Sequence, residues 1–332
     1  QMAQAQASIG RALDMLDERD AAWSALEDAF AQATTLRMVD LQRVVANNLA
    51  NNRINHGGPA RAIQVIREAQ ALAPHFTMPA MPVFYLGILV QAHAQLGELG
   101  TALDLADEAL DRAIALGETI TLADCLLMTL GLRSALGDSD GVQRLLGATA
   151  GRSLDGLGYF GVKVALELSD HALHQGRRDE ARRLLASVGD VAALRIPPDR
   201  AAARQRMAAL ALADGDAAGT LAWLAPLDGE VLYTEVQAQC AALRLDAHRL
   251  LGRADPAALN QADQALADAN QGRQLPALAR LRLLRARRAA AVLAGDTATA
   301  ERCAGEATQL QGRLVASLGR RQALAPALGD AG

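Results

Sequence analysis

The chain has 332 residues, of which 51% are hydrophobic and 3% aromatic, and its formal net charge is −4. Alanine and leucine supply most of the apolar content, which is typical of packed helices and unusual for β-sheets. The near-neutral charge argues against direct binding of nucleic acid, which favours a basic face. There is no apolar run long enough to span a bilayer and no signal-peptide pattern, so no membrane partner is expected.

The cysteines and the first residues of the chain bear on its compartment. Cys125, Cys240 and Cys303 lie far apart and form no C-x-x-C pair. They are expected to be buried, reduced side chains of a cytoplasmic protein that binds no metal or other cofactor. Because the sequence begins Gln-Met and enters a helical pattern almost at once, we expect a piece of a longer protein that carries an effector activity elsewhere.

Eight turns separate apolar segments of helical periodicity along the chain. Each turn holds glycine or charged residues suited to ending one helix and capping the next. In chain order the turns are DERD from Asp17, HGGP from His56, LGELG from Leu96, LGDSD from Leu136, QGRRD from Gln175, DGDAAG from Asp214, LGRADP from Leu251 and AGDTA from Ala294.

The segments that follow these turns share a register of mostly small and larger apolar residues at positions i, i+4 and i+7. Their starts are separated by 40, 40, 40, 39, 39, 42 and 38 residues. This spacing places each trio on one helix face, where small side chains let two antiparallel helices approach closely. The trios are Ala22/Leu26/Ala29, Ala62/Ile66/Ala69, Ala102/Ala106/Ala109, Val142/Leu146/Thr149, Ala181/Leu185/Val188, Thr220/Leu224/Leu227, Ala262/Leu266/Ala269 and Ala300/Ala304/Ala307.

Each unit is therefore predicted to be a helical hairpin, with an A helix before the turn and a B helix after it. A single hairpin cannot bury apolar surface on both of its sides, whereas stacked hairpins can. The predicted fold is all-α, an α-solenoid. Proline pairs between units, Pro79 with Pro82 and Pro197 with Pro198, suit the first turn of the following A helix.

The stretch FYLGILVQAHAQLGELGTALDLADEAL, residues 84–110, carries a family resemblance. Its helix-packing places hold Leu86, Leu89, Gly97, Ala102, Ala106, Ala109 and Leu110. In these places the sequence resembles the tetratricopeptide (TPR) repeat family, although its repeats run near 40 residues instead of 34 and mostly lack the usual aromatic residues. Repeats of this kind are similar to the TPR-like sensor regions of large bacterial transcriptional activators of the MalT and AfsR type. The resemblance implies a right-handed superhelix of about eight hairpins over residues 1–312, with a capping helix and tail over residues 313–332.

Two glycine-rich stretches match nucleotide-binding signatures only superficially. Gly156, Gly158 and Gly161 fit G-x-G-x-x-G, but that signature requires a preceding β-strand. The stretch GATAGRS, residues 147–153, is one residue short of a phosphate loop and follows a helical pattern. Both are interpreted as parts of an inter-repeat link.

Two polar clusters allow more than one interpretation. Asp170, His171 and His174 occupy adjacent helical positions and could ligate a metal if further ligands converged on them. Surface or groove histidines are the favoured interpretation, and a metal-dependent enzyme at these residues remains the minor alternative. The basic run RLRLLRARR, residues 280–288, is interpreted as a solvated helix face, with contact to an acidic partner as its alternative.

The asparagine-rich stretch of residues 44–63 is predicted to be an A helix that ends at HGGP. In TPR-like solenoids A helices line the concave surface, and the resemblance implies that Asn47 and Asn51 face it. The family's equivalent asparagine often holds the backbone of an extended peptide, and a carboxamide can both donate to and accept from a main chain. Asparagine also costs a helix about 0.5 kcal/mol relative to alanine, which makes a purely solvated face less attractive. The candidate groove residues are Asn47, Asn51, Asn55, Gln91, Gln95, Asp170, His174, Gln205, Arg282 and Arg285.

The function expected from these features is non-enzymatic. The chain would be a protein-, peptide- or effector-binding module of a larger bacterial signalling protein, of the transcriptional-regulator kind, with possible homo-oligomerisation. The alternative is a structural scaffold that binds proteins through its convex or end surfaces. An exposed apolar patch on the B helices would favour the scaffold.

Overall fold

A computed structural model describes residues 2–16, 18–72, 79–152, 159–230, 232–268 and 273–329. Over these ranges every regular element is helical, with sixteen α-helices and three 3-10 helices. The prediction of an all-α chain is confirmed. None of the described helices has the length and apolar character that crossing a membrane requires.

The helices follow one another with short connections. The first eight are α1 (Met2–Met15), α2 (Arg19–Thr35), α3 (Val39–Asn55), α4 (Pro59–Leu72), α5 (Met81–Leu96), α6 (Leu99–Leu116), α7 (Thr119–Ala135) and α8 (Ser139–Thr149). The others are α9 (Tyr159–His174), α10 (Arg178–Ser187), η2 (Val191–Ala193), α11 (Pro197–Ala213), α12 (Ala217–Leu224), η3 (Ala225–Leu227), α13 (Thr234–Leu250), α14 (Pro256–Asp268), α15 (Ala277–Leu293), α16 (Thr297–Ser317) and η4 (Gly319–Leu328).

The turns predicted from the sequence separate paired helices. HGGP joins α3 to α4, so the asparagine-rich stretch is helical as far as Asn55. Gly57 and Gly97 have φ angles of +83° and +81°, in the left-handed region that ends helices and disfavours side chains. Asp138 and Asp216 then accept hydrogen bonds from the backbone N–H three residues ahead, at 3.2 and 2.7 Å. These contacts satisfy one of the free N–H groups at the start of α8 and α12.

Several smaller sequence expectations can be compared with the elements. Pro82 and the pair Pro197 and Pro198 lie in the first turns of α5 and α11, as predicted. Gly156 and Gly158 lie outside the described residues, whereas Gly161 belongs to the first turn of α9. No strand precedes that turn in the described chain up to residue 152, so the dinucleotide signature lacks its structural context there.

The chain was expected to divide after residue 312, and this position lies inside a continuous helix. α16 runs on to Ser317, and the element after it is the 3-10 helix η4, which contains Pro326. A proline inside a helix removes a backbone donor, which favours this tighter and irregular form over an α-helix.

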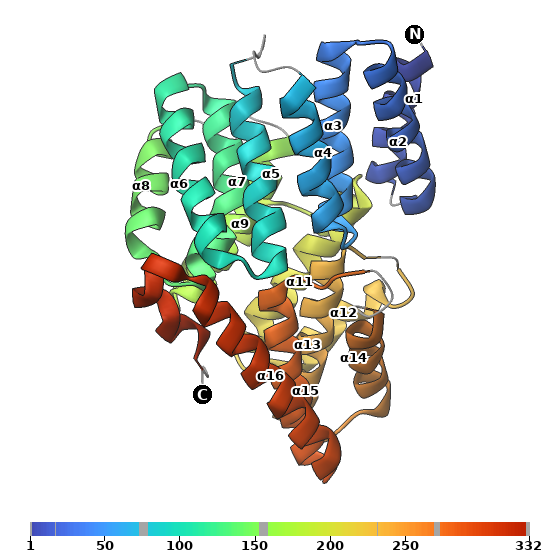
Figure 1. The fold of residues 1–332 in the computed structure, drawn as a ribbon. Coiled ribbons are helices and arrows are strands. Elements are labelled where there is room, and N and C mark those ends of the chain that lie inside the picture. The colour runs from blue at the N-terminus through green and yellow to red at the C-terminus, as the bar shows by residue number, and fades with distance from the viewer. Residues whose placement is uncertain are drawn as a thin grey trace.

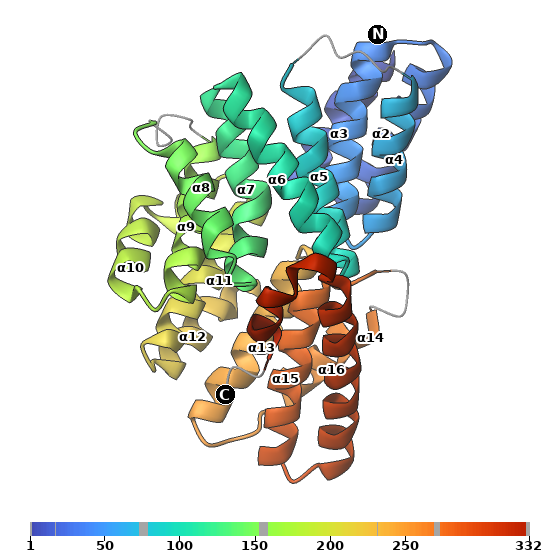
Figure 2. The ribbon, with the colours of Figure 1, turned by 60° about the vertical axis from the view of Figure 1, so that its left-hand side comes forward.

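The helices pack in adjacent pairs, as in an α-solenoid (Figures 1 and 2). The odd-numbered helices α1 to α15 form one continuous layer in which each contacts the next odd-numbered helix. The even-numbered helices form a second layer and pack against the odd-numbered helices beside them. The predicted A helices are therefore the odd-numbered ones, and the predicted B helices are the even-numbered ones.

The predicted trios lie where paired helices meet. Ala22, Leu26 and Ala29 of α2 have no exposed surface, and the second and third trios are equally buried. Small side chains at these places let the helix axes approach, and the larger apolar residue fills the remaining space. Ala269 of the seventh trio lies outside the described residues.

The C-terminal end of the solenoid folds back onto its second and third units. α15 contacts α5, and both α16 and η4 contact α6. Leu314 of α16 and Leu328 of η4 belong to the same buried core as Leu99 of α6. The backbone N–H of Gln274 donates to the carbonyl of Gly57 at 2.9 Å. In Figure 1 the orange and red C-terminal helices lie directly below the blue and teal N-terminal ones, so the closure joins units far apart in sequence.

Candidate binding face

The asparagines of α3 divide between two roles. The Nδ2 of Asn51 donates to the backbone carbonyl of Asn47 at 3.0 Å, and the Oδ1 of Asn47 is buried without a hydrogen-bond partner. Asn52 is fully buried, and its Nδ2 donates to the Oδ1 of Asp14 in α1 at 2.6 Å. Asn52 therefore joins neighbouring helices through its Nδ2, and its Oδ1, like that of Asn47, is buried without a hydrogen-bond partner. A buried acceptor without a partner is costly unless something satisfies it.

Three further candidates lie at the ends of α3 and α5. The Nε2 of Gln95 donates to the carbonyl of Ile54 at 3.1 Å, and Gln95 is only 7% exposed. The carbonyl of Asn55 accepts a hydrogen bond from the Oγ1 of Thr234, at 3.4 Å, across the closure. Gln91, one turn before Gln95, remains partly exposed. Gln95 thus ties α5 to α3, and the backbone of Asn55 ties α3 to α13.

Asp170 and Gln205 meet around a single cation, Arg206 of α11. The Nε of Arg206 lies 2.9 Å from the Oδ2 of Asp170, and its Nη2 lies 2.7 Å from the Oε1 of Glu167. Its Nη1 donates to the Oε1 of Gln205 at 3.4 Å. The guanidinium therefore holds two carboxylates of α9 against α11.

This group extends over four consecutive odd-numbered helices. Lys163 of α9 lies 3.7 Å from Asp199 of α11, and its charge also acts on Asp124 of α7. Glu235 of α13 interacts electrostatically with Arg206. Five carboxyl groups therefore face two cations. We call this set the odd-helix charge cluster; its members are Asp124, Lys163, Glu167, Asp170, Asp199, Arg206 and Glu235.

Close packing of the odd-numbered helices brings their carboxyl groups together. A Cβ at Gly87 of α5 would lie 2.9 Å from the Cγ of Met128 and 3.6 Å from the Oδ2 of Asp124. A Cβ at Gly131 of α7 would lie 3.3 Å from the Oε2 of Glu167. Glycine at both places allows the next odd-numbered helix to approach, with a carboxyl group beside each contact.

The surroundings of the cluster shift its titration toward neutral pH. Burial raises the pKa of Asp124 to about 7, although the charge of Lys163 acts in the opposite direction. Burial also raises the pKa of Glu167 to about 7, against the effect of Arg206. Both side chains keep some access to solvent. The surrounding protein therefore raises both pKa values although neither side chain is fully covered.

Two other carboxyl groups of the cluster shift in the same direction. Burial raises the pKa of Asp199, which Lys163 only partly opposes. Surrounding protein likewise raises the pKa of Glu235, although this residue is exposed. The cluster thus contains more carboxyl groups than cations, and burial favours the uncharged forms of four of them; perturbed groups of this kind are enriched at functional sites.

The three residues of the metal alternative point to different partners. The Nδ1 of His171 lies 2.8 Å from the Oγ of Ser134, and burial lowers the pKa of this histidine. His174 is exposed, and its Nδ1 lies 2.8 Å from the carbonyl of Asp170 in its own helix. The carboxylate of Asp170 is occupied by Arg206. Within the described ranges no group of three His, Cys, Asp or Glu side chains is placed to hold a metal ion.

The basic run of α15 is largely engaged within the chain. Arg285 donates to the Oε1 of Gln311 at 3.0 Å and to the carbonyl of Leu328 at 2.7 Å, which anchors the end of η4. Arg287 is only 5% exposed and binds both carboxylate oxygens of Asp263. Arg282 is exposed. The two predicted groove arginines therefore differ: Arg285 serves packing, and Arg282 faces solvent.

The sequence interpretation missed most of the odd-helix charge cluster. Lys163, Glu167 and Asp170 follow the i, i+4, i+7 spacing of one helix face, and Asp199 and Arg206 follow i, i+7. The same periodicity that revealed the apolar trios would have revealed these charged stripes on the A helices. Their convergence depends on contacts between successive helices, which the sequence does not specify.

Comparison of the chain with known proteins gave no assignment. Neither the protein-family models nor the curated proteins include a match to this sequence.

We expect Asp124→Asn to stabilise the protein at alkaline pH. A raised pKa in the folded state means that ionisation opposes folding, so wild-type stability is lost as pH rises from about 4 to about 7. Asparagine removes that cost, and after allowance for solvent access the gain should be about 1–2 kcal/mol at pH 8 and near zero at pH 4. Urea unfolding at both pH values measures it, with the exposed Asp28→Asn as control. Equal effects of Asp124→Asn at the two pH values would show that this carboxyl titrates normally.

Proposed function

We propose that the chain is a right-handed superhelix of about eight TPR-like hairpins and acts as a non-enzymatic binding module. The continuous layer of odd-numbered helices and its return from α15 to α5 support this arrangement. Among the described residues, successive odd-numbered helices contact each other more closely than successive even-numbered ones, as expected when the odd-numbered layer is the shorter, inner side of a superhelix. Its side chains then converge, as expected for the binding surface of a solenoid.

The ligand would be a protein or peptide segment, or a small effector, that carries positive charge. The observation that supports this proposal is the excess of carboxyl groups in the odd-helix charge cluster, which Lys163 and Arg206 only partly neutralise. A cationic group placed among these carboxyl groups would favour their ionised forms and supply the missing charge. Asn47, whose side chain is partly exposed, would add a carboxamide contact to a peptide backbone.

A peptide-binding experiment tests the proposal. We expect arrays of 12-residue peptides to show selective binding of Lys- and Arg-containing sequences, tightening as pH rises through about 7 because the ionised carboxylates bind the cation. Glu167→Gln combined with Asp199→Asn should weaken the best binder about tenfold or more. The matched control is Asp179→Asn with Glu180→Gln, which removes the same charge from α10.

The outcomes separate the parts of this proposal. Asn47→Ala with Asn51→Ala should weaken peptides of any charge, since a carboxamide binds the main chain. No selective peptide, or equal binding by the cluster variant and its control, would contradict the charge-based proposal. If the asparagine pair also had no effect on binding, the groove assignment as a whole would fail.

The regulatory role is a separate proposal. We propose that ligand capture biases an attached effector domain of a bacterial signalling protein, of the transcriptional-regulator kind. The resemblance to TPR-like sensor regions supports it. The full-length gene tests it directly: an adjoining helix-turn-helix, ATPase, cyclase or kinase domain agrees with the proposal, and a metabolic enzyme domain does not.

The scaffold alternative has one observation in its favour, at the end of the solenoid on the A helix α1 and not on a B helix. Met2 and Ile9 of α1, and Leu16 directly after it, are spaced seven residues apart and are 68%, 53% and 64% exposed. This places three large apolar side chains on one side of the helix. In the peptide experiment, binding that survives the cluster variant and is lost in Ile9→Glu would favour the scaffold.

A further inference from the structure

The C-terminal arm of the protein, residues 273–329, has a charge opposite to that of the units it packs against. Residues 273–332 contain ten arginines and four acidic residues, whereas residues 1–152 contain eleven arginines and seventeen acidic residues. The small net charge of the whole chain is therefore the sum of a basic C-terminal part and an acidic N-terminal part, and the first folds back onto the second. Charge complementarity of this kind favours docking between separate surfaces.

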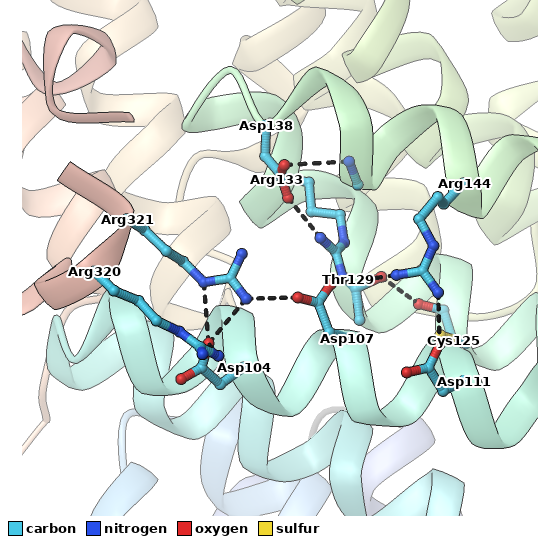
Figure 3. Close-up of polar contacts among 11 residues, drawn as sticks. Asp104, Asp107, Asp111, Cys125, Thr129, Arg133, Asp138, Arg144, Arg320 and Arg321 are labelled. Carbon is cyan, nitrogen blue, oxygen red and sulfur yellow. Dashed lines mark hydrogen bonds and ion pairs between the residues drawn. The ribbon is translucent and has the colours of Figure 1, made fainter. Parts of the chain in front are cut away.

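The two surfaces meet at an arginine clasp, formed by Arg320 and Arg321 of η4 with Asp104 and Asp107 of α6 (Figure 3). The Nη2 of Arg320 lies 2.9 Å from the Oδ1 of Asp104. The Nη2 of Arg321 lies 2.8 Å from the same oxygen and 2.5 Å from the Oδ2 of Asp107. Hydrogen bonds from the arginines hold the pKa of Asp104 below its usual value.

The clasp is exposed enough for salt to weaken it. The side chains of Arg320 and Asp104 are 77% and 47% exposed, whereas those of Arg321 and Asp107 are 19% and 33% exposed. Charges in such positions are screened by ions, because the Debye length falls from about 10 Å at 0.1 M to about 3 Å at 1 M. The element that carries both arginines is a 3-10 helix, whose hydrogen-bond geometry is weaker than that of an α-helix.

Two backbone N–H groups report on closure at separate points. The N–H of Leu99, at the start of α6, donates to the Oγ of Ser317 at 3.1 Å. The N–H of Gln274 donates to the carbonyl of Gly57 at 2.9 Å, at the other end of the contact. Both N–H groups would become accessible to solvent if the arm moved away from the first units. α6 and the C-terminal arm approach closely at Gly100, because a Cβ there would lie 2.6 Å from the carbonyl oxygen of Ser317.

We propose that the C-terminal arm is a reversible closure of the solenoid, and that the arginine clasp controls its release. The apolar contacts of Leu314 and Leu328 with the core shared by α6 favour the closed form, and the clasp sets how strongly closure responds to ionic strength. Opening would separate α15 from α5 and widen access to the layer of odd-numbered helices. This inference concerns the chain alone and does not depend on the proposed ligand.

Hydrogen exchange in the ligand-free protein tests the closure. Arg320→Gln with Arg321→Gln should speed exchange of the N–H groups of both Leu99 and Gln274 by about five- to thirty-fold at low salt. Wild-type exchange at these groups should approach that of the variant near 1 M salt. The control is Arg288→Gln with Arg313→Gln, which removes the same charge from exposed positions of the arm.

The pattern of exchange decides between release of the arm and local fraying. If only residues 319–328 exchange faster while Gln274 stays protected, the clasp holds η4 alone and the closure proposal is overturned. A steric test is independent of charge. Gly100→Leu should open the contact at every salt concentration, whereas Gly305→Leu, where a Cβ would meet nothing within 4 Å, should leave it closed. Unchanged protection of Leu99 and Gln274 in Gly100→Leu would equally overturn the proposal.

Discussion

Arg206→Met is expected to lower the free energy of unfolding by about 3 kcal/mol at pH 8, because removing one partner leaves enclosed charges uncompensated. Arg206 is the cation that binds both Glu167 and Asp170. Without it the pKa of Glu167, which burial already raises, should rise further. The loss should therefore shrink as pH falls toward 5, where Glu167 takes up a proton in the folded state. Chemical unfolding across this pH range measures the effect.

A second substitution identifies the origin of that loss. Adding Glu167→Gln to Arg206→Met removes a repelling charge, so it should recover part of the stability at pH 8 and little at pH 5. Arg204→Met, a partly exposed arginine on the same helix, is the control and should change stability by less than about 1 kcal/mol. A loss from Arg206→Met that is independent of pH would show that the side chain acts through packing alone.

The odd-helix charge cluster contributes to the stability of the fold and is also the proposed binding site. A cationic ligand and Arg206 compete for a limited number of carboxylates. Ligand binding should therefore be strongest when the fewest of these carboxylates are paired with a cation of the chain itself. Arg206→Met should therefore lose stability and yet bind a cationic peptide at least as tightly as the wild-type protein. Opposite effects on folding and binding are expected of a site and would not arise from a purely structural ion pair.

The regular part of this fold could be predicted from the sequence, because it depends on local spacing. Ala62, Ile66 and Ala69 repeat a register seen throughout the chain, and they are completely buried. The turn at Gly57 and the helical state of the asparagine-rich stretch followed from the same register. Helix periodicity and helix-ending residues act over a few positions, so they can be recognised in the sequence without knowledge of tertiary structure.

The site could be predicted only in part, because it depends on contacts between distant units. Asp170 and Gln205 were identified, and they meet at Arg206, which was not. Gln95 was expected to face a ligand, yet its amide joins α5 to α3. The closure through Asp104 and Arg321 links positions more than 200 residues apart, and nothing in a repeat register specifies how far the solenoid turns before its ends meet.

Arg133→Met is expected to lower the free energy of unfolding by about 3–5 kcal/mol. Arg133 is only 1% exposed, and its guanidinium binds Asp138 at 2.5 Å and Asp107 at 2.8 Å (Figure 3). It therefore joins the turn before α8 to α6, next to the arginine clasp. Its loss leaves two carboxylates short of a partner, although Asp107 keeps Arg321 and lies 4.0 Å from Arg144. Arg144→Met is the control, because Arg144 is half exposed and pairs mainly with Asp111, and should cost less than about 1 kcal/mol.

A double-mutant cycle with Gly141 locates the effect in the guanidinium itself. A Cβ at Gly141 would lie 2.0 Å from the Nη1 of Arg133, so Gly141→Ala should destabilise the wild-type protein despite the better helix propensity of alanine. In the Arg133→Met background that clash is absent, and the same substitution should cost at least about 1 kcal/mol less. Additive effects would mean that the space beside Gly141 is set by the Asp138 carboxylate, which also approaches that position, and that Arg133 acts only through charge.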